Sequence, residues 1–352
     1  MLIRRKKTRV IKIGNCLIGG THPVAIQSMV KYRATDVEKS LKQIRELEAA
    51  GCEIVRFAVK DIRDARALKK IKKESKIPIV ADIHFDYRLA LEAIDSGVDK
   101  IRLNPGNIYK REEIREVVAG LKNAKIPLRI GVNSGSVRDL HSKNAAGNLV
   151  KSALEYIKTV EGFKFHNIVV SLKASNVLDT VSAYREMSGL CDYPMHLGVT
   201  ATGSPFAGAI KSSVALGALL LDGIGDTIRV SLTDIPVREV YAAKVILESL
   251  GLRKFGHSLI SCPTCGRCEV DLVKIVSELE EKLEQGAKRS NPSKPIKIAV
   301  MGCVVNGPGE AKEADIGIAF GKSEGMLFRK GKALRKVSYS DCVDVLLKEI
   351  EK

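Results

Sequence analysis

Short apolar runs alternate with longer segments of helical periodicity between residues 24 and 250. The runs are rich in Val, Ile and Leu, as in strands that are buried on both faces of a parallel sheet. They cover residues 24–28, 54–59, 78–83, 100–103, 128–132, 168–172, 195–199 and 227–231. Between them, apolar residues recur every three to four positions, which predicts helices over residues 37–50, 62–74, 112–123, 149–160 and 237–250.

Strand–helix units repeated in this way are typical of a (β/α)8 barrel, the TIM barrel. A doubly wound open sheet is the alternative, but eight units fit a closed barrel better. The chain contains neither the glycine fingerprint of dinucleotide-binding folds nor a P-loop. We therefore predict an α/β protein whose residues 1–255 form a TIM barrel.

The sequence pattern changes after Phe255. A cysteine-rich segment leads into a charged helical segment at 271–285 and a lysine-rich linker at 288–294. Three strand-like runs and a last helical segment follow, at residues 296–301, 316–320, 326–329 and 340–350. This pattern predicts a smaller α+β domain over residues 256–352.

The net charge of +17 favours an anionic partner, such as a phosphorylated substrate, an acidic protein or a nucleic acid. Aromatic residues make up only 5% of the chain and tryptophan is absent, so few side chains could stack on nucleic-acid bases. The basic N-terminus is not followed by the apolar stretch of a secretory signal. No apolar run reaches the ~20 residues that a membrane span needs. We therefore expect a cytoplasmic protein with no nucleic-acid partner and no membrane segment.

Polar residues recur two or four positions apart near the ends of the predicted strands, where barrel enzymes build their active sites. The pairs are Asp82 with His84, Arg102 with Asn104, Arg129 with Asn133, Ser171 with Lys173, and Arg229 with Ser231, and Arg56 lies near the end of its own strand. Five of these residues are cations that would repel one another unless an anion lay among them. Guanidinium groups suit phosphate oxygens, so the pattern predicts a phosphate site. His84 is a candidate proton carrier, and His196 is expected to be structural.

Four cysteines lie in two turns rich in Gly and Pro. Residues 262–268 read Cys-Pro-Thr-Cys-Gly-Arg-Cys, and Cys303 lies in the stretch Met-Gly-Cys-Val-Val-Asn-Gly-Pro-Gly-Glu. Cys262, Cys265, Cys268 and Cys303 could bind zinc through four thiolates or hold a [4Fe–4S] cluster. Cys262, Cys265 and Cys303 with another ligand, such as Glu310, are an equally open choice. The isolated cysteines are expected in the core, at positions 16, 52, 191 and 342.

Six segments together carry a resemblance to a known family. They are Val-Ala-Asp-Ile-His-Phe-Asp-Tyr-Arg at 80–88, Arg-Leu-Asn-Pro-Gly-Asn at 102–107, Arg-Ile-Gly-Val-Asn at 129–133, Gly-Ile-Gly-Asp-Thr-Ile-Arg-Val-Ser-Leu at 223–232, Cys-Pro-Thr-Cys-Gly-Arg at 262–267 and Gly-Cys-Val-Val-Asn-Gly-Pro-Gly-Glu at 302–310. Over nearly its whole length the chain resembles the 4-hydroxy-3-methylbut-2-en-1-yl diphosphate synthases of the non-mevalonate isoprenoid pathway, in their two-domain bacterial form.

The resemblance implies an iron–sulfur oxidoreductase that opens 2-C-methyl-D-erythritol 2,4-cyclodiphosphate by reduction and dehydration. It implies that Cys262, Cys265, Cys303 and Glu310 ligate a [4Fe–4S] cluster, and Glu310, Asp82 and His84 are the candidate catalytic residues. Those implied for the diphosphate are Arg56, Arg102, Asn104, Arg129, Asn133, Lys173, Arg229 and Ser231. The implied partners are flavodoxin or ferredoxin as electron donor and a second copy of the chain, whose cluster domain caps the barrel.

Two positions depart from the family pattern. The family usually carries a glutamate in a turn after the seventh strand, but here that turn reads Thr-Ala-Thr-Gly and has Ala201 in its place. Another acid, water or His84 would then supply a proton, or the chain would be slow or divergent. Cys268 is the second departure, and it is either a spare thiol beside the cluster or a fourth ligand in place of Glu310.

Two other functions remain open from the sequence. One is a barrel enzyme that acts on a different anionic small molecule, such as a pterin-type synthase, and carries a structural zinc domain. The other is a basic, zinc-bearing protein that binds nucleic acid, which would show steeply salt-dependent binding.

Overall fold

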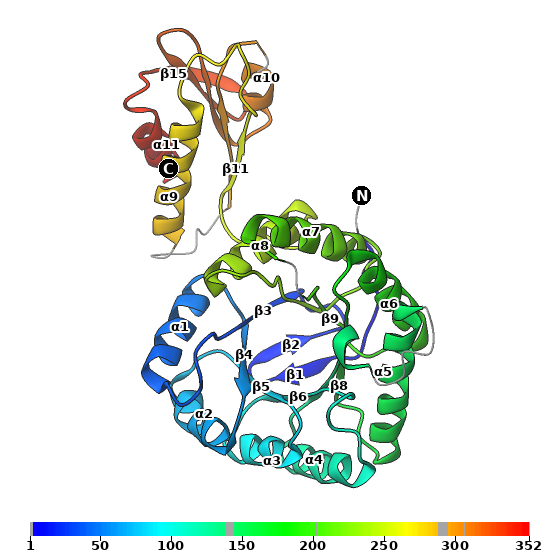
Figure 1. Ribbon diagram of the computed structural model, residues 1–352. Helices are drawn as coiled ribbons and strands as arrows, with labels where there is room; N and C mark the ends of the chain where they lie inside the picture. The colour runs from blue at the N-terminus through cyan, green and yellow to red at the C-terminus, as the bar shows by residue number, and fades with distance from the viewer. Residues whose placement is uncertain (1–2, 138–143, 201–202, 288–294, 306, 352) are drawn as a thin grey trace. The chain divides into compact units, whose positions relative to one another are not determined.

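The computed structural model describes residues 3–137, 144–200, 203–287, 295–305 and 307–351. The chain divides into two compact units, Met1–Arg253 and Lys254–Lys352 (Figure 1). Ala201, where the resemblance led us to expect a glutamate, lies outside the described residues. Within the described residues, no helix is long and apolar enough to cross a membrane.

The first unit is the predicted (β/α)8 barrel (Figure 1). Its eight parallel strands pair in the order β8-β7-β6-β5-β4-β3-β10-β9. They are β3 (Ala25–Met29), β4 (Ile54–Val59), β5 (Ile79–Ile83), β6 (Lys100–Leu103), β7 (Leu128–Asn133), β8 (Ile168–Lys173), β9 (His196–Leu197) and β10 (Thr227–Ile228). A parallel bridge between Val170 and Met195 joins β8 to the β9 side and closes the barrel.

In the described part of this unit, eight α-helices surround the strands (Figure 1). They are α1 (Val37–Ala49), α2 (Ile62–Glu74), α3 (Tyr87–Asp95), α4 (Arg111–Ala124), α5 (Ala145–Gly162), α6 (Val177–Leu190), α7 (Pro205–Leu221) and α8 (Pro236–Ser249). Side-chain caps begin several of them: Asp61 accepts from backbone amides of α2, Asp86 from one of α3 and Asn176 from one of α6. The 3-10 turn η1 (Ser134–Ser136) follows β7.

A hairpin of β1 (Ile11–Ile13) and β2 (Cys16–Ile18) was not predicted from the sequence. Its apolar side chains pack against Ala25, Ile54 and Val80 from the first parts of the barrel strands. The turn between the two strands contains Gly14 at φ +57°, where a Cβ would lie 2.7 Å from Oδ1 of Asp99. The hairpin therefore covers the N-terminal end of the barrel and leaves the opposite end for a site.

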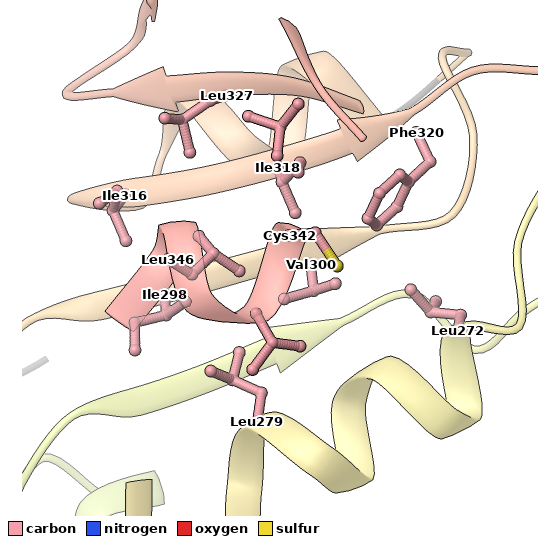
Figure 2. Packing of buried hydrophobic residues seen from close by; sticks show 12 residues of the cluster. Leu272, Leu279, Ile298, Val300, Ile316, Ile318, Phe320, Leu327, Cys342 and Leu346 are labelled. Atoms are coloured by element: carbon pink, nitrogen blue, oxygen red, sulfur yellow. The ribbon is translucent and has the colours of Figure 1, made fainter. Parts of the chain in front are cut away.

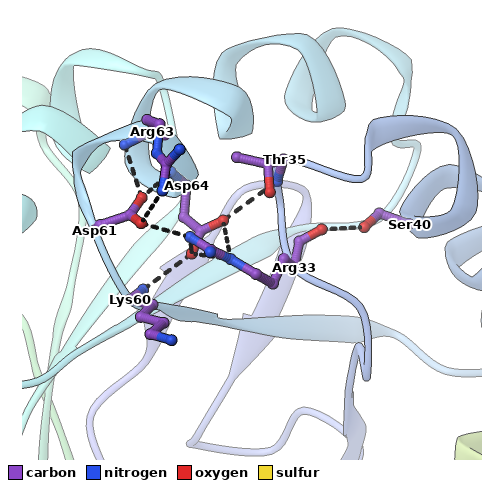
Figure 3. A network of polar contacts seen from close by, with 7 residues as sticks. All are labelled: Arg33, Thr35, Ser40, Lys60, Asp61, Arg63 and Asp64. Atoms are coloured by element: carbon purple, nitrogen blue, oxygen red, sulfur yellow. Dashed lines mark hydrogen bonds and ion pairs between the residues drawn. The ribbon is translucent and has the colours of Figure 1, made fainter.

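The loops that follow β3 and β4 are tied together by a buried carboxylate (Figure 3). Asp64 is fully buried, and its Oδ2 lies 2.9 Å from Nη2 of Arg33. It also accepts from the backbone amides of Thr35, at 3.3 Å, and Lys60, at 3.2 Å. The same Arg33 nitrogen donates to Asp61 at 2.7 Å. This network fixes the positions of two loops at the C-terminal ends of the strands.

The second unit contains a five-stranded sheet in the order β11-β12-β13-β14-β15. Its strands are β11 (Ser258–Ser261), β12 (Lys297–Met301), β13 (Ile316–Phe320), β14 (Gly325–Arg329) and β15 (Lys332–Val337). The first three strands run parallel, and the last two continue antiparallel. Its helices are α9 (Leu272–Ala287), α10 (Gly307–Lys312) and α11 (Cys342–Ile350). This is an α+β arrangement.

The core of this unit follows the alternation of strand residues between two faces. Ile298 and Val300 of β12 lie in one cluster with Leu279 of α9 and Leu346 of α11 (Figure 2). Ala299 and Met301, the intervening residues of β12, belong to a second cluster that includes Ala311 and Ala314 of the α10 side. Each face of the sheet is therefore covered by helix.

Candidate active site

A polar cavity of about 90 Å³ lies at the C-terminal ends of the barrel strands. Its lining residues come from β4 to β8 and from the segments that follow β9 and β10. They are Arg56, Asp82, His84, Arg102, Arg129, Asn133, Ser171, Lys173, Thr200, Arg229 and Ser231. A buried water needs on the order of 10–15 Å³ of such volume, so the cavity has room for several waters or a phosphate-sized group.

Asp82 is the one carboxylate among the described residues that line this cavity. Its Oδ1 accepts from Nη1 of Arg102 at 2.8 Å, and its Oδ2 lies 3.6 Å from Nε of Arg56. Burial alone would raise the pKa of Asp82, but the charges of Arg102 and Arg56 hold that pKa well below its ordinary value. Asp82 is therefore ionised and orients two cations of the cavity.

Arg129 and Lys173 are buried in the cavity wall, and Asp82, the carboxylate of the cavity among the described residues, is already paired with Arg102 and Arg56. Both side chains are buried, and the described residues offer no hydrogen-bond partner to Nε or Nη1 of Arg129. Burial, and then the charges of Arg56, Arg129 and Arg229, lower the pKa of Lys173 well below its ordinary value. An anion in the cavity would favour the charged form of Lys173 and supply acceptors for Arg129.

Arg129 corrects one detail of the sequence analysis. It is the second residue of β7 and so lies near the beginning of that strand, although its side chain lines the cavity. Arg56, likewise, is the third of the six residues of β4. Because guanidinium side chains are long, these two arginines reach the cavity from positions nearer the beginnings of their strands than we expected from the sequence.

Glu239, on α8, was missed in the sequence analysis. It is 1% exposed, and its Oε1 and Oε2 lie 3.2 and 3.3 Å from Nη2 and Nε of Arg229. It also accepts from Oγ of Ser28 at 2.9 Å and from the amide of Leu232 at 3.2 Å, and it lies 3.3 Å from Nζ of Lys31. Because Glu239 stands in the first turn of a helix, its sequence context predicts only an N-terminal charge.

Gly131 and Gly198 lack a side chain where cations of the cavity lie. The sequence analysis did not predict this role for either glycine. A Cβ on Gly131 would lie 2.4 Å from Nε of Arg102, whose Nη2 donates to the Gly131 carbonyl at 2.8 Å. A Cβ on Gly198 would lie 2.6 Å from Nζ of Lys173 and 2.9 Å from the Arg229 carbonyl. Side chains at these positions would displace the cations.

His84 lies at the edge of the cavity with a third of its side chain exposed, 34%. Its Nε2 is 2.9 Å from Nη1 of Arg102, and its Nδ1 is 2.8 Å from Nδ2 of Asn107. A guanidinium only donates, so Nε2 accepts from Arg102 in this arrangement. The next residue, Phe85, has φ +64° and is 78% exposed. His84 is thus oriented toward the cavity, while Phe85 projects into solvent.

Asn104 lies behind the cavity wall and is not among the lining residues. It is 2% exposed, and its Nδ2 donates to Oγ of Ser136 at 2.9 Å. Its Oδ1 accepts from the amide of Gly106 at 3.1 Å. Asn104 therefore holds the loop after β6 against the turn after β7, whereas Asn133 and Ser231 line the cavity as the sequence pattern suggested.

The cysteine segments are neighbours in the second unit. Cys262 follows β11 and Cys303 follows β12, and these strands are paired in parallel. The Gly302 amide donates to Sγ of Cys262 at 3.4 Å, and the Glu269 amide donates to the Gly302 carbonyl at 2.9 Å. Cys265 is exposed. Hydrogen bonds to sulfur and thiols on short loops are features of iron–sulfur sites, so the donor chemistry fits such a cluster.

Within the described part of the chain, no three Cys, His, Asp or Glu side chains lie close enough together to hold a metal ion. Glu310 is exposed in the first turn of α10. Cys268 packs over the backbone, because a Cβ on Gly302 would lie 2.3 Å from its Sγ, and that thiol donates to the Val270 carbonyl at 3.3 Å. Cys268 thus has a packing role of its own.

Comparison with known proteins finds two domains of one family along the chain. Residues 8–244 match the GcpE TIM-barrel domain, and residues 258–352 match the GcpE protein C-terminal domain. The chain is 53% identical over 353 residues to the 4-hydroxy-3-methylbut-2-en-1-yl diphosphate synthase (flavodoxin) of Clostridium perfringens, covering 99% of each protein. It is 52% identical over 355 residues to the synthase of the same name from Thermodesulfovibrio yellowstonii, covering 100% of both.

Among solved structures, the dihydropteroate synthase of Stenotrophomonas maltophilia matches with a TM-score of 0.55 and 13% identity, over 70% of this chain and 100% of that one. At this identity the likeness shows the barrel fold alone and gives no support to a pterin substrate. The two domain matches and the full-length relatives show that the chain belongs to the GcpE family.

Proposed function

We propose that the chain is an iron–sulfur oxidoreductase that performs the reaction of its relatives in non-mevalonate isoprenoid biosynthesis. It converts 2-C-methyl-D-erythritol 2,4-cyclodiphosphate to 4-hydroxy-3-methylbut-2-enyl diphosphate. Two electrons and two protons enter, one carbon–oxygen bond of the ring breaks, and a hydroxyl group leaves as water. The observation that carries the proposal is the cavity that five Arg and Lys side chains line together with one carboxylate among the described residues.

The cations of the cavity would bind the diphosphate. The proposed set is Arg56, Arg102, Arg129, Lys173 and Arg229, with Asn133 and Ser231 as neutral partners and Asn104 as a residue that holds the adjoining loop. A cyclic diphosphate carries oxygens that can pair with several of these groups at once. As the ring opens, charge grows on the freed phosphate oxygen, and fixed cations stabilise it without having to reorganise.

Asp82 and His84 would act on this assembly in different ways. Asp82 is held ionised and keeps Arg102 and Arg56 in place, so we assign it a positioning role. His84 faces the cavity and would carry a proton after its contact with Arg102 changes on substrate binding. This leaves His84 as the proton carrier that Ala201 does not provide.

Cys262, Cys265, Cys303 and Glu310 would hold a [4Fe–4S] cluster in the second unit. When bound, such a cluster supplies the electrons and a Lewis-acidic iron for the departing hydroxyl. As a carboxylate beside three thiolates, Glu310 would be a weak ligand that can be displaced. We assign Cys268 no ligand role, because its thiol packs over Gly302 and bonds to Val270.

A protein surface would cover the barrel mouth during the reaction. Within the described residues, exposed apolar side chains follow seven of the eight barrel strands, namely Tyr32, Ile62, Phe85, Tyr109, Leu178, Phe206 and Ile235. A ring of such residues around a polar cavity is typical of a surface that another protein contacts. We propose that the cluster domain of a second copy, in a homodimer, is that partner.

The electron donor would be flavodoxin or ferredoxin, since the names of the relatives specify flavodoxin and the net charge of +17 suits an acidic donor. Reduced thiols at the cluster ligands fit a cytoplasmic location. A nucleic-acid partner is disfavoured, because the five cations lie inside a cavity where a polymer backbone would not reach them.

Calorimetric titration of the cyclic diphosphate into the protein tests the binding site without requiring turnover. Lys173→Gln and Arg229→Gln should each weaken binding about ten- to a hundredfold, because each removes a charge-assisted contact worth about 1.5–3 kcal/mol. Arg238→Gln is the matched control, since Arg238 is an exposed cation of α8 that pairs with Asp234. Equal affinity in all three variants and the wild type would contradict the proposed site.

A further inference from the structure

A second set of polar side chains lies inside the barrel, beneath the cavity residues. Strand residues two or four apart point to the same face. Lys100 is two positions before Arg102 on β6, and Arg129 is four positions before Asn133 on β7. His196 of β9 is in register with Thr227 of β10, two positions before Arg229, and Gln27 of β3 lies two positions before Met29, which is in register with Arg56. We refer to Gln27, Lys100, Arg129 and His196 as the inner layer.

The inner layer is buried yet incompletely hydrogen-bonded. The four side chains are at most 1% exposed. Within the described part of the chain, no partner meets Nζ of Lys100, either amide atom of Gln27, Nε2 of His196, or Nε and Nη1 of Arg129. Buried polar atoms are nearly always hydrogen-bonded to protein, water or an ion, so these atoms are expected to contact a bound water or ion.

The inner layer is also positively charged. Lys100 and Arg129 are its ionisable cations, and it contains no carboxylate. The nearest carboxylate of the cavity, Asp82, is already paired with Arg102 and Arg56. Burial, and then the charge of Arg129, lower the pKa of Lys100 well below its ordinary value. Lys100 could lose its proton, but a guanidinium cannot, so positive charge remains to be balanced.

The histidine of this layer is arranged to donate inward. Nδ1 of His196 lies 2.8 Å from Oγ1 of Thr227. When the threonine hydroxyl donates to Nδ1, the proton of the neutral ring stands on Nε2, the nitrogen without a protein partner. The expectation that His196 is a satisfied structural residue therefore holds for only one of its two nitrogens.

We propose that the inner layer binds a small inorganic anion of the halide class. Lys100 and Arg129 supply the charged donors, and Nε2 of His196 and the Gln27 amide complete the shell. A monatomic anion accepts from single donors that arrive from separate strands. The site adjoins the diphosphate cavity through Arg129, which lines that cavity, whereas Gln27, Lys100 and His196 do not. Its effects would be to stabilise the barrel and to moderate the positive potential below the cavity.

Crystals of the wild-type protein grown in sodium bromide test this site directly. Anomalous scattering should show bromide in contact with Nζ of Lys100 and the guanidinium of Arg129. If bromide is seen only in the diphosphate cavity or on the surface, the result is an adventitious ion only, and it contradicts the proposal. Density for water alone within the inner layer would contradict it as well.

Unfolding in solution supplies a second test that needs no crystal. In bromide, compared with the larger isethionate anion at equal ionic strength, the wild-type unfolding constant should fall about tenfold, because the anion binds only the folded state. Lys100→Met, or Lys100→Gln where the first variant does not fold, should lose this dependence. Lys173→Gln changes a cavity cation and should keep it.

Two results would overturn the inference. One is a bromide effect that persists in the Lys100 variants but disappears in Lys173→Gln, which would place the anion in the diphosphate cavity. The other is a ratio of the unfolding constants of wild type and Lys100→Met that does not depend on bromide. In this case the ratio would change by up to tenfold per pH unit below the unfolded-state pKa of lysine. That behaviour is expected of a buried lysine that has lost its proton in the folded state.

Discussion

A Cβ atom on Gly131 would lie 2.4 Å from Nε of Arg102, while the Gly131 carbonyl accepts from Nη2 of the same side chain at 2.8 Å. Gly131 thus both admits Arg102 to the cavity and orients it. Arg102 in turn contacts Asp82 and His84, so one glycine on β7 governs the position of residues from two other strands.

Gly131→Ala should therefore displace Arg102 and weaken binding of the cyclic diphosphate about tenfold or more, the loss expected when a charge-assisted contact is removed. Calorimetric titration measures this loss. Gly135→Ala is the matched control, because a Cβ on Gly135 would meet no atom within 4 Å. Unchanged affinity in Gly131→Ala would show that Arg102 does not depend on this space.

Glu239→Gln should weaken the interaction that holds Arg229 in place, and it should therefore raise KM more than it lowers kcat. The carboxylate contacts Nη2 and Nε of Arg229, and the amide keeps the shape while losing the charge. We expect a change of about tenfold in KM, and a double-mutant cycle with Arg229→Gln should show coupling of about 1 kcal/mol or more. Additive effects of the two substitutions would mean that Glu239 acts independently of Arg229.

Asp82 should give the barrel an acid-sensitive contribution to stability. Although burial opposes it, the charges of Arg102 and Arg56 depress the folded-state pKa of Asp82, so the unfolded chain binds this proton more readily. The contribution is present above the unfolded-state pKa of about 3.9 and is lost as the pH falls toward the folded-state pKa. The stability advantage of wild type over Asp82→Asn should therefore shrink between about pH 5 and about pH 3. Urea unfolding measures it, and a constant difference would argue against a depressed pKa.

Cys268→Ser should retain the iron of the wild-type protein, whereas Cys303→Ser should lose it. Anaerobic absorption spectra with iron and sulfide analysis should give about four irons per chain for wild type and Cys268→Ser. Cys191→Ser, in the barrel unit, is the control for general effects of cysteine removal. Loss of iron from Cys268→Ser would instead indicate four thiolate ligands and no displaceable carboxylate.

The barrel was predictable because each strand is a continuous apolar run, and the five cavity cations were visible because they interrupt those runs. Helices α3, α6 and α7 were expected as parts of the eight strand–helix units, but their residue ranges were not predicted. On α7 apolar residues cover most of the surface, which obscures helical periodicity. The hairpin of β1 and β2 was missed because three-residue strands leave little pattern.

The sequence pattern could not predict the residues that position the cavity side chains. Gly131 and Gly198 have no side chain to mark them, and Glu239 reaches Arg229 from a helix whose first turn ordinarily carries exposed acids. Asn104 was predicted to bind the diphosphate, but its contact with Ser136 depends on how two loops meet. These relationships come from packing between elements and not from local pattern.

Conversion of the cyclic diphosphate under anaerobic conditions tests the central claim most directly. The iron-loaded protein is incubated with the substrate and a chemically reduced flavodoxin, and the phosphorus NMR spectrum is followed. The account predicts that the cyclic diphosphate signals are replaced by those of a linear diphosphate, and that Glu310→Ala and Lys173→Gln slow this change while Arg238→Gln does not. An unchanged substrate spectrum with fully iron-loaded wild-type protein would contradict it.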